Sequence, residues 1–451
     1  MNRLPTGIRS IRRCRVSGLV IGLLLVSVAA QAESTGYRDP EFGRIPFEKW
    51  LAEGKSQIHW NVSIRPPELS THQRLILRVA IGMDGKELEK RRGAGEFLEM
   101  IQYRDAAGHV WQSPASIDLK NMKPGMQRQN VDATFYAFIL PGDYTVSAAI
   151  CDSNTLEHSV TVRRLHVDAP KTDPLSGAWA GLPAVEVISS LTEPPDVWFL
   201  PEITTGLNLH VATQKPVHIR VLLNTTPSQR VSGSVAAMRA NMSLLIPALK
   251  ILSRLDLPNG TVDAELLDLT HRRVIFEQKN IHELNWPDIR RYFIETRPGI
   301  IDAASLQGQW KMRKFFWDEV RRRLEPGRDG AVPVVIVLSG PAFLEDQEPV
   351  EPAIRGGETD RRLFYIRYRP PAAARSIGRS TLLRDTMMGR TGGRGRIPPM
   401  NQPEDDSLIP PMPVDDLEHT VEPLNARLFD AASARQFRRI LAAVLEQISG
   451  M

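Results

Sequence analysis

The stretch Val332-Pro333-Val334-Val335-Ile336-Val337-Leu338 is the segment of this sequence that most strongly indicates the fold. It is a nearly unbroken run of β-branched side chains, which is typical of a strand buried on both faces in a parallel sheet. Around this run, strand-like and helix-like patterns alternate from residue 217 to the end of the chain. The alternation predicts an α/β doubly wound sheet within residues 201–451.

The spacing of apolar residues predicts the individual elements of this half. Helices are expected at residues 242–255, 306–324 and 437–448, and Pro247 should either kink the first of them or begin it. Strands are expected at residues 217–223, 262–269, 274–276 and 363–368. An insertion at about residues 370–413 is rich in Pro, Gly and Arg, which predicts disorder. We interpret it as a solvated linker; the alternative is a segment that docks on an acidic partner.

Residues 56–168 have a different texture, in which apolar and polar residues alternate in short runs separated by turn signals. This period of two predicts an antiparallel, immunoglobulin-like β-sandwich. The segment Leu140-Pro141-Gly142-Asp143-Tyr144-Thr145-Val146 resembles a hairpin common in immunoglobulin-like modules of exported bacterial proteins. Residues 33–55 are expected to lead into the sandwich, and the prolines of residues 169–200 predict a linker after it.

The first 32 residues have the three parts of a secretory signal peptide. Arginines precede an apolar run at residues 16–30, and Ala30-Gln31-Ala32 supplies a small-x-small cleavage pattern, so cleavage is expected after Ala32. The alternative is an uncleaved anchor helix, but the run is shorter than the roughly 20 residues that a span needs. The protein is therefore expected to be exported to the periplasm or secreted, with no membrane span after cleavage.

Charge and cysteine content narrow the functional classes further. The chain has 57 Lys and Arg against 52 Asp and Glu, and five of the arginines lie in the predicted signal peptide. The remainder is formally neutral, which argues against nucleic acid as a partner.

Cys14 also lies in the signal peptide, so Cys151 would remain alone and no internal disulfide could form. We expect Cys151 to be a buried small apolar residue.

Three short motifs between residues 217 and 344 resemble, in order and spacing, landmarks of the von Willebrand factor A (VWA) family. Where the family has D-x-S-x-S after its first strand, the chain has Asn224-Thr225-Thr226-Pro227-Ser228. The family's GTALYDA segment corresponds to Arg297-Pro298-Gly299-Ile300-Ile301-Asp302-Ala303, and its VVLSDG segment to Val335-Ile336-Val337-Leu338-Ser339-Gly340-Pro341. The resemblance implies a VWA-like doubly wound domain.

The resemblance also implies the place of a metal site, at which this chain lacks the expected ligands. In the family, two aspartates, a threonine and two hydroxyls hold Mg²⁺ or Mn²⁺. Here Asn224 replaces the first aspartate, Pro298 the threonine, and Gly340 or its neighbour Pro341 the second aspartate. Only Thr226 and Ser228 retain side-chain oxygens. Because a hard dication needs hard and preferably anionic oxygens, we expect no bound metal or other cofactor.

The remaining side chains near this position also have simpler interpretations. Asn224 is expected to cap the loop after its strand, and Thr226 and Ser228 to bond local backbone. Glu345 and Asp346 could replace the missing carboxylates, but we interpret them as solvated loop acids.

The catalytic motifs in this sequence are less complete than the VWA-like motifs. Ser339 lacks the first glycine of a G-x-S-x-G elbow, and His282-Glu283 lacks the second histidine of H-E-x-x-H.

The leading hypothesis is therefore a metal-independent protein-interaction module of the bacterial envelope that is not an enzyme and binds a protein partner. The alternatives are a structural scaffold for envelope assembly and an enzyme with an unrecognised site.

Overall fold

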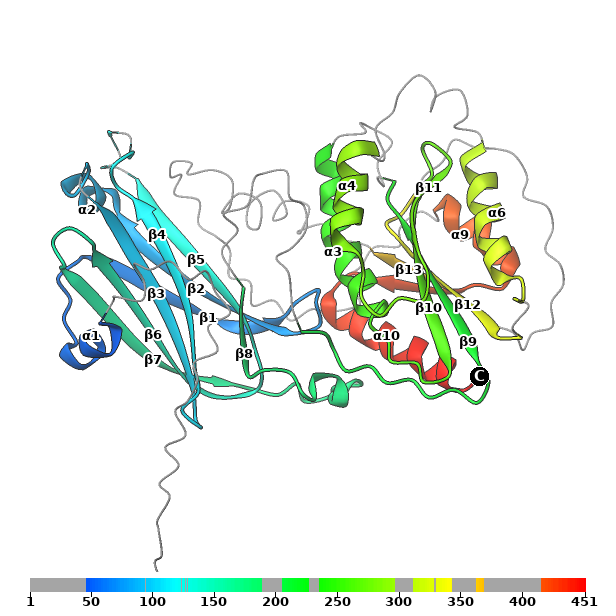
Figure 1. The fold of residues 1–451 in the computed structure, drawn as a ribbon, viewed down its shortest axis with the longest axis horizontal. Helices are drawn as coiled ribbons and strands as arrows, with labels where there is room; N and C mark the ends of the chain where they lie inside the picture. The colour runs from blue at the N-terminus through cyan, green and yellow to red at the C-terminus, as the bar shows by residue number, and fades with distance from the viewer. Residues whose placement is uncertain are drawn as a thin grey trace, which may run out of the picture.

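The computed structural model describes residues 46–188, 205–226, 235–296, 311–342, 362–368 and 415–451, apart from residues 94, 123, 126, 128, 328 and 329. The predicted signal peptide and the predicted insertion lie outside these residues. Figure 1 shows two units, one built of strands β1–β8 and the other of strands alternating with helices. Among the described residues, no helix combines the length and the apolar character needed to cross a membrane.

The first unit contains two four-stranded sheets in which every pairing is antiparallel. The sheet β1-β2-β5-β8 contains Trp60–Leu69, Leu75–Asp84, Asn130–Ile139 and Val185–Ile188. The sheet β4-β3-β6-β7 contains Val110–Asp118, Glu96–Asp105, Gly142–Asp152 and His158–Val167. Helix α1 (Phe47–Glu53) packs on the second sheet through Phe47 and Trp50, and α2 (Gly85–Lys90) follows β2.

Alternate residues of these strands form the core between the two sheets. Leu77 and Ile81 of β2 and Ile101 of β3 have no exposed surface, as the period-two pattern requires. Glu99 follows the same alternation on β3 and is fully buried, and neither of its carboxylate oxygens has a hydrogen-bond partner in the part of the chain that the structure describes. Burial raises the pKa of Glu99 to about 8. Cys151 is buried, as expected, and burial raises its thiol pKa to about 12.

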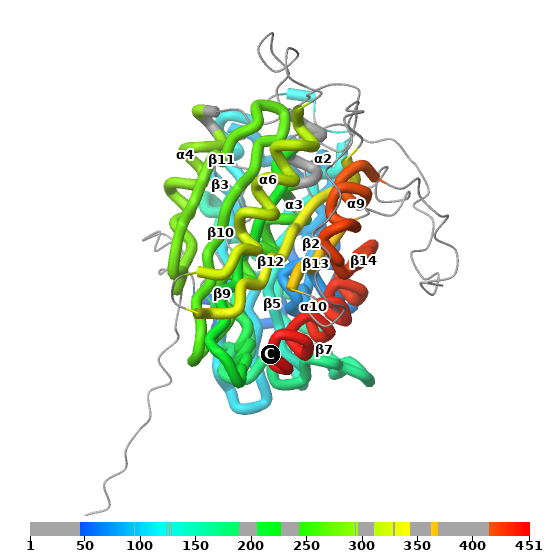
Figure 2. Tube along the Cα trace, turned by 90° about the vertical axis from the view of Figure 1, so that its right-hand side faces the viewer, coloured from blue at the N-terminus to red at the C-terminus, as the bar shows by residue number. Residues whose placement is uncertain are grey.

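The second unit is built on a six-stranded sheet in the order β11-β10-β9-β12-β13-β14. The strands are Arg273–Gln278, Gly260–Asp268, Val217–Asn224, Val332–Ser339, Leu363–Tyr368 and Arg427–Ala431. All neighbours are parallel except β10 and β11, which form an antiparallel hairpin. Figure 2 shows the strands following one another across the sheet. The mixed α/β content predicted from the sequence is thus confirmed.

Helices cover both faces of this sheet. Apolar residues of α3 (Val235–Leu252), α4 (Trp286–Thr296) and α10 (Ala434–Ser449) join one core cluster. Residues of α6 (Met312–Leu324) and α9 (Asp416–Val421) join a second cluster on the opposite face. Coverage of both faces explains why β12 is apolar from Val332 to Leu338. Pro247 lies inside α3, not in its first turn.

Several elements differ from the sequence expectation. Strand β13 has the expected bounds, but α4 and β14 were not predicted. Strand β14 is a five-residue edge strand that is only partly buried, so it lacks the long apolar run that marks β12. Strand β8 comes from the proline-rich stretch interpreted as a linker, and it pairs with β5.

Candidate functional site

The carboxyl edge of the six-stranded sheet is the place where a doubly wound fold positions a binding site. The order of the parallel strands reverses between β9 and β12, because β10 follows β9 on one side and β13 follows β12 on the other. Ligands of such sheets bind in the crevice outside the carboxyl ends of the strands at this switch point. Strand β9 ends at Asn224 and β12 ends at Ser339, so these two residues lie at the switch point.

The side chains of Asn224 and Ser339 are joined directly across the switch point. Asn224 Nδ2 donates a hydrogen bond to Ser339 Oγ at 2.9 Å, and both residues are buried. Asn224 Oδ1 accepts a hydrogen bond from the backbone N–H of Thr226 at 2.9 Å. Ser339 Oγ in turn donates to the carbonyl of Gly340 at 2.6 Å. The amide of Asn224 therefore joins the ends of β9 and β12 and caps the loop after β9.

The two threonines after Asn224 attach this loop to the end of β10. Thr225 Oγ1 donates to the Leu267 carbonyl at 2.9 Å. Thr226 Oγ1 accepts a hydrogen bond from the Leu269 N–H, also at 2.9 Å. The Leu267 carbonyl also accepts a hydrogen bond from the Thr225 N–H at 2.9 Å, so the loop is attached there by both backbone and side chain. Thr226 thus bonds backbone, but its partner Leu269 lies 43 positions away and is not the local backbone that the sequence interpretation expected.

An arginine occupies the centre of the acidic group at the same edge. Arg367, near the end of β13, donates from Nη1 to Asp415 Oδ2 and Glu418 Oε2, each at 2.6 Å. Its Nε donates to Asp430 Oδ1 at 2.7 Å. Asp415 also caps α9, where it accepts from the Glu418 N–H at 2.7 Å. The Tyr365 hydroxyl donates to Asp415 at 3.2 Å.

The electrostatics of this group follow from its burial and its pairing. Burial raises the pKa of Asp415, although the hydrogen bond from Arg367 opposes that shift. Burial and the negative charge of Asp415 raise the pKa of the Tyr365 hydroxyl. Burial disfavours the charge of Arg367, but its bonds with Asp430 and Asp415 outweigh that effect and raise its pKa. The guanidinium is therefore permanently charged and compensates the carboxylates around it.

The acid at the end of β10 is also engaged. Asp268 has no exposed surface, and its Oδ2 lies 2.6 Å from His271 Nδ1 and 3.3 Å from Arg273 Nη2. Among the described residues, no three His, Cys, Asp or Glu side chains are arranged to hold a metal ion. The side-chain donors that the described residues place at the switch point are one amide and a few hydroxyls, which do not suit Mg²⁺ or Ca²⁺.

Three of the five positions singled out from the sequence belong to this edge. Asn224, Thr226 and Gly340 lie around the switch point. Ser228 and Pro298 lie outside the described residues, as do Glu345 and Asp346.

Sequence reasoning did not identify the arginine and its acidic partners. A signal was present, because Arg367 is a charged residue inside the otherwise apolar and aromatic strand β13. Buried charges of this kind need partners, but the sequence alone did not indicate Asp415, which is 48 positions away.

Comparisons with known proteins leave this chain without an assigned family. No family model matches it, and no curated protein does. A structural-genomics target named SoR45 matches with a TM-score of 0.17 and 12% identity, covering 26% of this chain and 97% of that one. A β-glucuronidase from Bacteroides uniformis matches with a TM-score of 0.18 and 8% identity, covering 62% of this chain and 33% of that one.

Proposed function

We propose that this chain is an exported, metal-independent protein-interaction module in which a VWA-like domain follows an immunoglobulin-like sandwich. The observation that carries the proposal is the hydrogen bond between Asn224 and Ser339 at the switch point. An amide stands where the VWA resemblance expects a metal-binding carboxylate, and both ends of that amide are already bonded within the protein.

The sheet order supports the VWA-like part of this proposal. A doubly wound sheet with five parallel strands and one antiparallel edge strand places the first and fourth strands of the unit, β9 and β12, side by side. Two of the three motifs that carry the resemblance, at residues 224–228 and 335–341, include the carboxyl ends of those two strands. For the sandwich part, support comes from two antiparallel four-stranded sheets that enclose a common core.

The pairing of Arg367 supports the metal-independent part. A guanidinium already pairs with Asp415 and Glu418 at this edge, so a dication would have to displace Arg367 to bind these acids. A partner that binds here would have to be recognised by hydrogen bonding and shape, without a metal bridge.

The first experiment measures thermal unfolding in EDTA and then in millimolar Mg²⁺, Mn²⁺ or Ca²⁺. Specific binding to the folded state raises the unfolding midpoint by mass action, and we expect no such rise. The triple variant Asn224→Asp/Pro298→Thr/Gly340→Asp restores the ligand types of the family and should acquire a metal-dependent rise. A rise in the unmodified protein that Ser228→Ala abolishes would overturn the metal-independent assignment.

A second candidate function is a structural scaffold for envelope assembly. It is favoured by direct contacts between the two units. Arg438 of α10 forms an ion pair with Asp173, which lies in the segment between β7 and β8. A junction of this kind holds two domains in a fixed arrangement, as an assembly component requires.

Site-specific cross-linking separates the two candidates. A photo-reactive residue at the partly exposed His419, on α9 beside the carboxyl edge, is compared with one at the exposed Lys49 on α1. The interaction module predicts an adduct with a different protein at position 419 only, persisting in EDTA. The scaffold predicts adducts with a second copy of the chain.

A further inference from the structure

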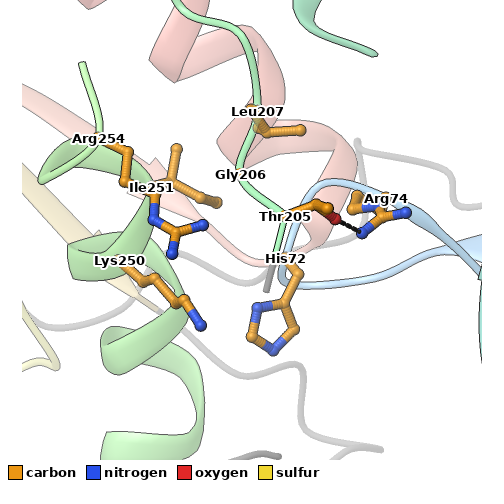
Figure 3. A pocket seen from close by; sticks show the side chains of 8 residues that line it. All are labelled: His72, Arg74, Thr205, Gly206, Leu207, Lys250, Ile251 and Arg254. Atoms are coloured by element: carbon orange, nitrogen blue, oxygen red, sulfur yellow. Dashed lines mark hydrogen bonds between the residues drawn. The ribbon is translucent and has the colours of Figure 1, made fainter. Parts of the chain in front are cut away.

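The cavity at the junction of the two units has room for about one water molecule. It measures about 20 Å³, and in Figure 3 its lining comes from both units, with His72 and Arg74 on one side and Lys250 and Arg254 on the other. Within this lining, Arg74 Nη1 donates a hydrogen bond to Thr205 Oγ1 at 2.7 Å. The junction is therefore packed too closely for a phosphate group or a peptide, whereas one edge of the sandwich is open.

This open edge is strand β7, which the rest of the chain covers only at its start (Figure 1). There the Gln57 N–H donates to the His158 carbonyl at 3.1 Å, and the Val160 N–H donates to the Lys55 carbonyl, also at 3.1 Å. Helix α1 ends with its cap at Gly54, directly before Lys55. The chain therefore follows β7 no further along this side.

The backbone groups farther along the same side of β7 are free. In an antiparallel strand, alternate residues direct both N–H and C=O to the same side, and Val160 directs its N–H away from β6. Val162, Arg164 and His166 continue this series, and none of them bonds to another strand on this side in the described part of the chain. The Val162 carbonyl accepts only from the adjacent Arg163 side chain, at 3.2 Å. The edge thus offers a ladder of unoccupied backbone donors and acceptors.

The other edge strands of the sandwich are less suited to accepting a strand. Strand β1 contains Pro66 and Pro67 and a shift of register between Arg65 and Glu68. Strand β4 contains Pro114, and β8 has only four residues. Proline cannot donate to a ladder and is typical of edges that do not pair. Strand β7 has ten residues and no proline.

Two arginines give the free part of this edge a positive charge. Arg163 and Arg164 are both exposed, and neither forms an ion pair with any residue that the structure describes. Asp143 and Asp168 lie at the far end of the strand, where they contact His166 at 2.7 and 3.5 Å. An incoming strand with acidic side chains would therefore be attracted to this edge.

A second copy of β7 is a poor match for the same edge. Antiparallel pairing centred on Arg163 or on Arg164 places that arginine directly opposite its own copy. Like charges directly opposite each other destabilise a pair of strands. The charge therefore opposes self-association while it favours an acidic strand from another protein.

Apolar surface beside the edge favours an added strand as well. Strand β1 lies at the same side of the sandwich as β7. Val62 and Ile64 of β1 and Leu165 of β7 pack against the core between the sheets but are only partly buried. Val162, on the outer face of β7, is 47% exposed. Apolar side chains of an added strand would cover part of this surface.

We propose that residues 161–166 of β7 form a docking edge for an extended acidic segment of a partner protein, which adds to the sheet as a further antiparallel strand. Main-chain hydrogen bonds provide the affinity of such strand addition, and alternate side chains provide its specificity. Acids of the partner face Arg163 and Arg164, and an apolar side chain packs beside Leu165. The docking edge belongs to the sandwich, so this inference does not depend on the function proposed for the carboxyl edge of the other unit.

The test titrates the purified protein with the fluorescently labelled and capped peptide Val-Glu-Glu-Val-Glu-Glu-Val, and fluorescence anisotropy measures binding. We expect saturable binding, whereas the matched peptide with lysine in place of glutamate should not bind. Hydrogen exchange locates the site, because the N–H groups of Val162, Arg164 and His166 should exchange more slowly when the acidic peptide pairs with them.

Two variants separate strand addition from simple charge attraction. Arg163→Gln/Arg164→Gln should weaken binding roughly fivefold, as expected for two exposed charge pairs. Val162→Pro retains both arginines and removes an N–H that β6 does not use, and it should weaken binding about tenfold. Lys314→Gln/Arg322→Gln, at exposed positions on α6, changes the charge equally and should bind as the unmodified protein does.

Several outcomes would overturn the proposal. One is absence of peptide binding, and another is equal binding by the two double variants. Binding that Val162→Pro leaves unchanged would mean charge attraction without strand addition. If Val162→Pro lowers the unfolding midpoint, exchange of the outward N–H groups in the unmodified protein decides the same point, and unchanged exchange overturns strand addition. Dimers of the unmodified protein that Val162→Pro dissociates would assign the edge to a second copy.

Discussion

Arg438 in the last helix forms a two-pronged ion pair with Asp173, a residue that lies 265 positions earlier in the chain. Its Nε lies 2.6 Å from Oδ1 of Asp173, and its Nη2 lies 2.7 Å from Oδ2. The same guanidinium lies 4.8 Å from the centroid of the Trp179 ring and donates to the Gln73 carbonyl at 3.2 Å. One side chain thereby joins α10 to the turn before β2 and to the segment before β8.

Arg438→Met should destabilise the protein by roughly 3–5 kcal/mol, because it leaves the buried Asp173 carboxylate uncompensated. Denaturant unfolding measures the loss. The double variant Arg438→Met/Asp173→Leu should recover part of it, since the unpaired charge is removed as well. Arg435→Met, at an exposed position on the same helix, is the control. A loss at Arg438 no larger than that of the control would contradict a structural role for the pair.

The buried Glu99 predicts an unusual dependence of stability on pH. Its pKa is about 8 in the folded protein, whereas an unburied glutamate, as in the unfolded chain, has a pKa of 4.5. Between these two pH values the folded state holds a proton that the unfolded state has lost. Stability should therefore fall as pH rises through this window, by about 1.4 kcal/mol per pH unit from this group. Glu99→Met should remove that slope and stabilise the protein near pH 8.

The measurement for Glu99 is denaturant unfolding at intervals from pH 5 to 8, roughly the window in which the two states differ in protonation. Glu277→Gln, at an exposed residue of β11, serves as the control and should keep the slope of the unmodified protein. Equal slopes in Glu99→Met and in the unmodified protein would show that Glu99 is not the responsible group.

Arg367→Met tests whether the guanidinium substitutes for a cation at the carboxyl edge. The variant should lose roughly 3–5 kcal/mol, because Asp415 and Glu418 would lose their common counter-charge. Millimolar Ca²⁺ should restore part of the loss in this variant only, since carboxylate oxygens suit that ion. Arg322→Met is the matched control. Absence of any Ca²⁺ effect would mean that the acids cannot converge on an ion once the arginine is removed.

Asn224→Ala should cost about 1–3 kcal/mol, because the buried Thr226 N–H would lose its acceptor and Ser339 Oγ would lose its donor. Asn121→Ala removes an asparagine whose amide bonds Asp118 in an exposed turn, and it should change stability by only about 0.5 kcal/mol or less. Thermal and denaturant unfolding give both values. If Asn224→Ala left the stability nearly unchanged, the Asn224 amide would not have the proposed structural role at the switch point.

Local patterns in the sequence were sufficient for the mixed α/β content and for most strands and helices. The apolar run at β12 reflects burial on two faces, and the alternation along β2 reflects burial on one face. Both patterns are visible in residues that are close together in the chain. Elements with weak patterns were missed, such as the short edge strand β14. At the carboxyl edge, the residue types at positions 224 and 340 were sufficient to predict that neither position offers a carboxylate.

The sequence by itself determined which chemical groups the switch point can offer, because an amide and a glycine cannot supply the carboxylates that a dication needs. Only the tertiary structure decided which groups meet. Arg367 reaches Asp415 across 48 positions, and Arg438 reaches Asp173 across 265. Such pairs depend on how sheets and helices pack, and no local periodicity records which distant side chains that packing brings together.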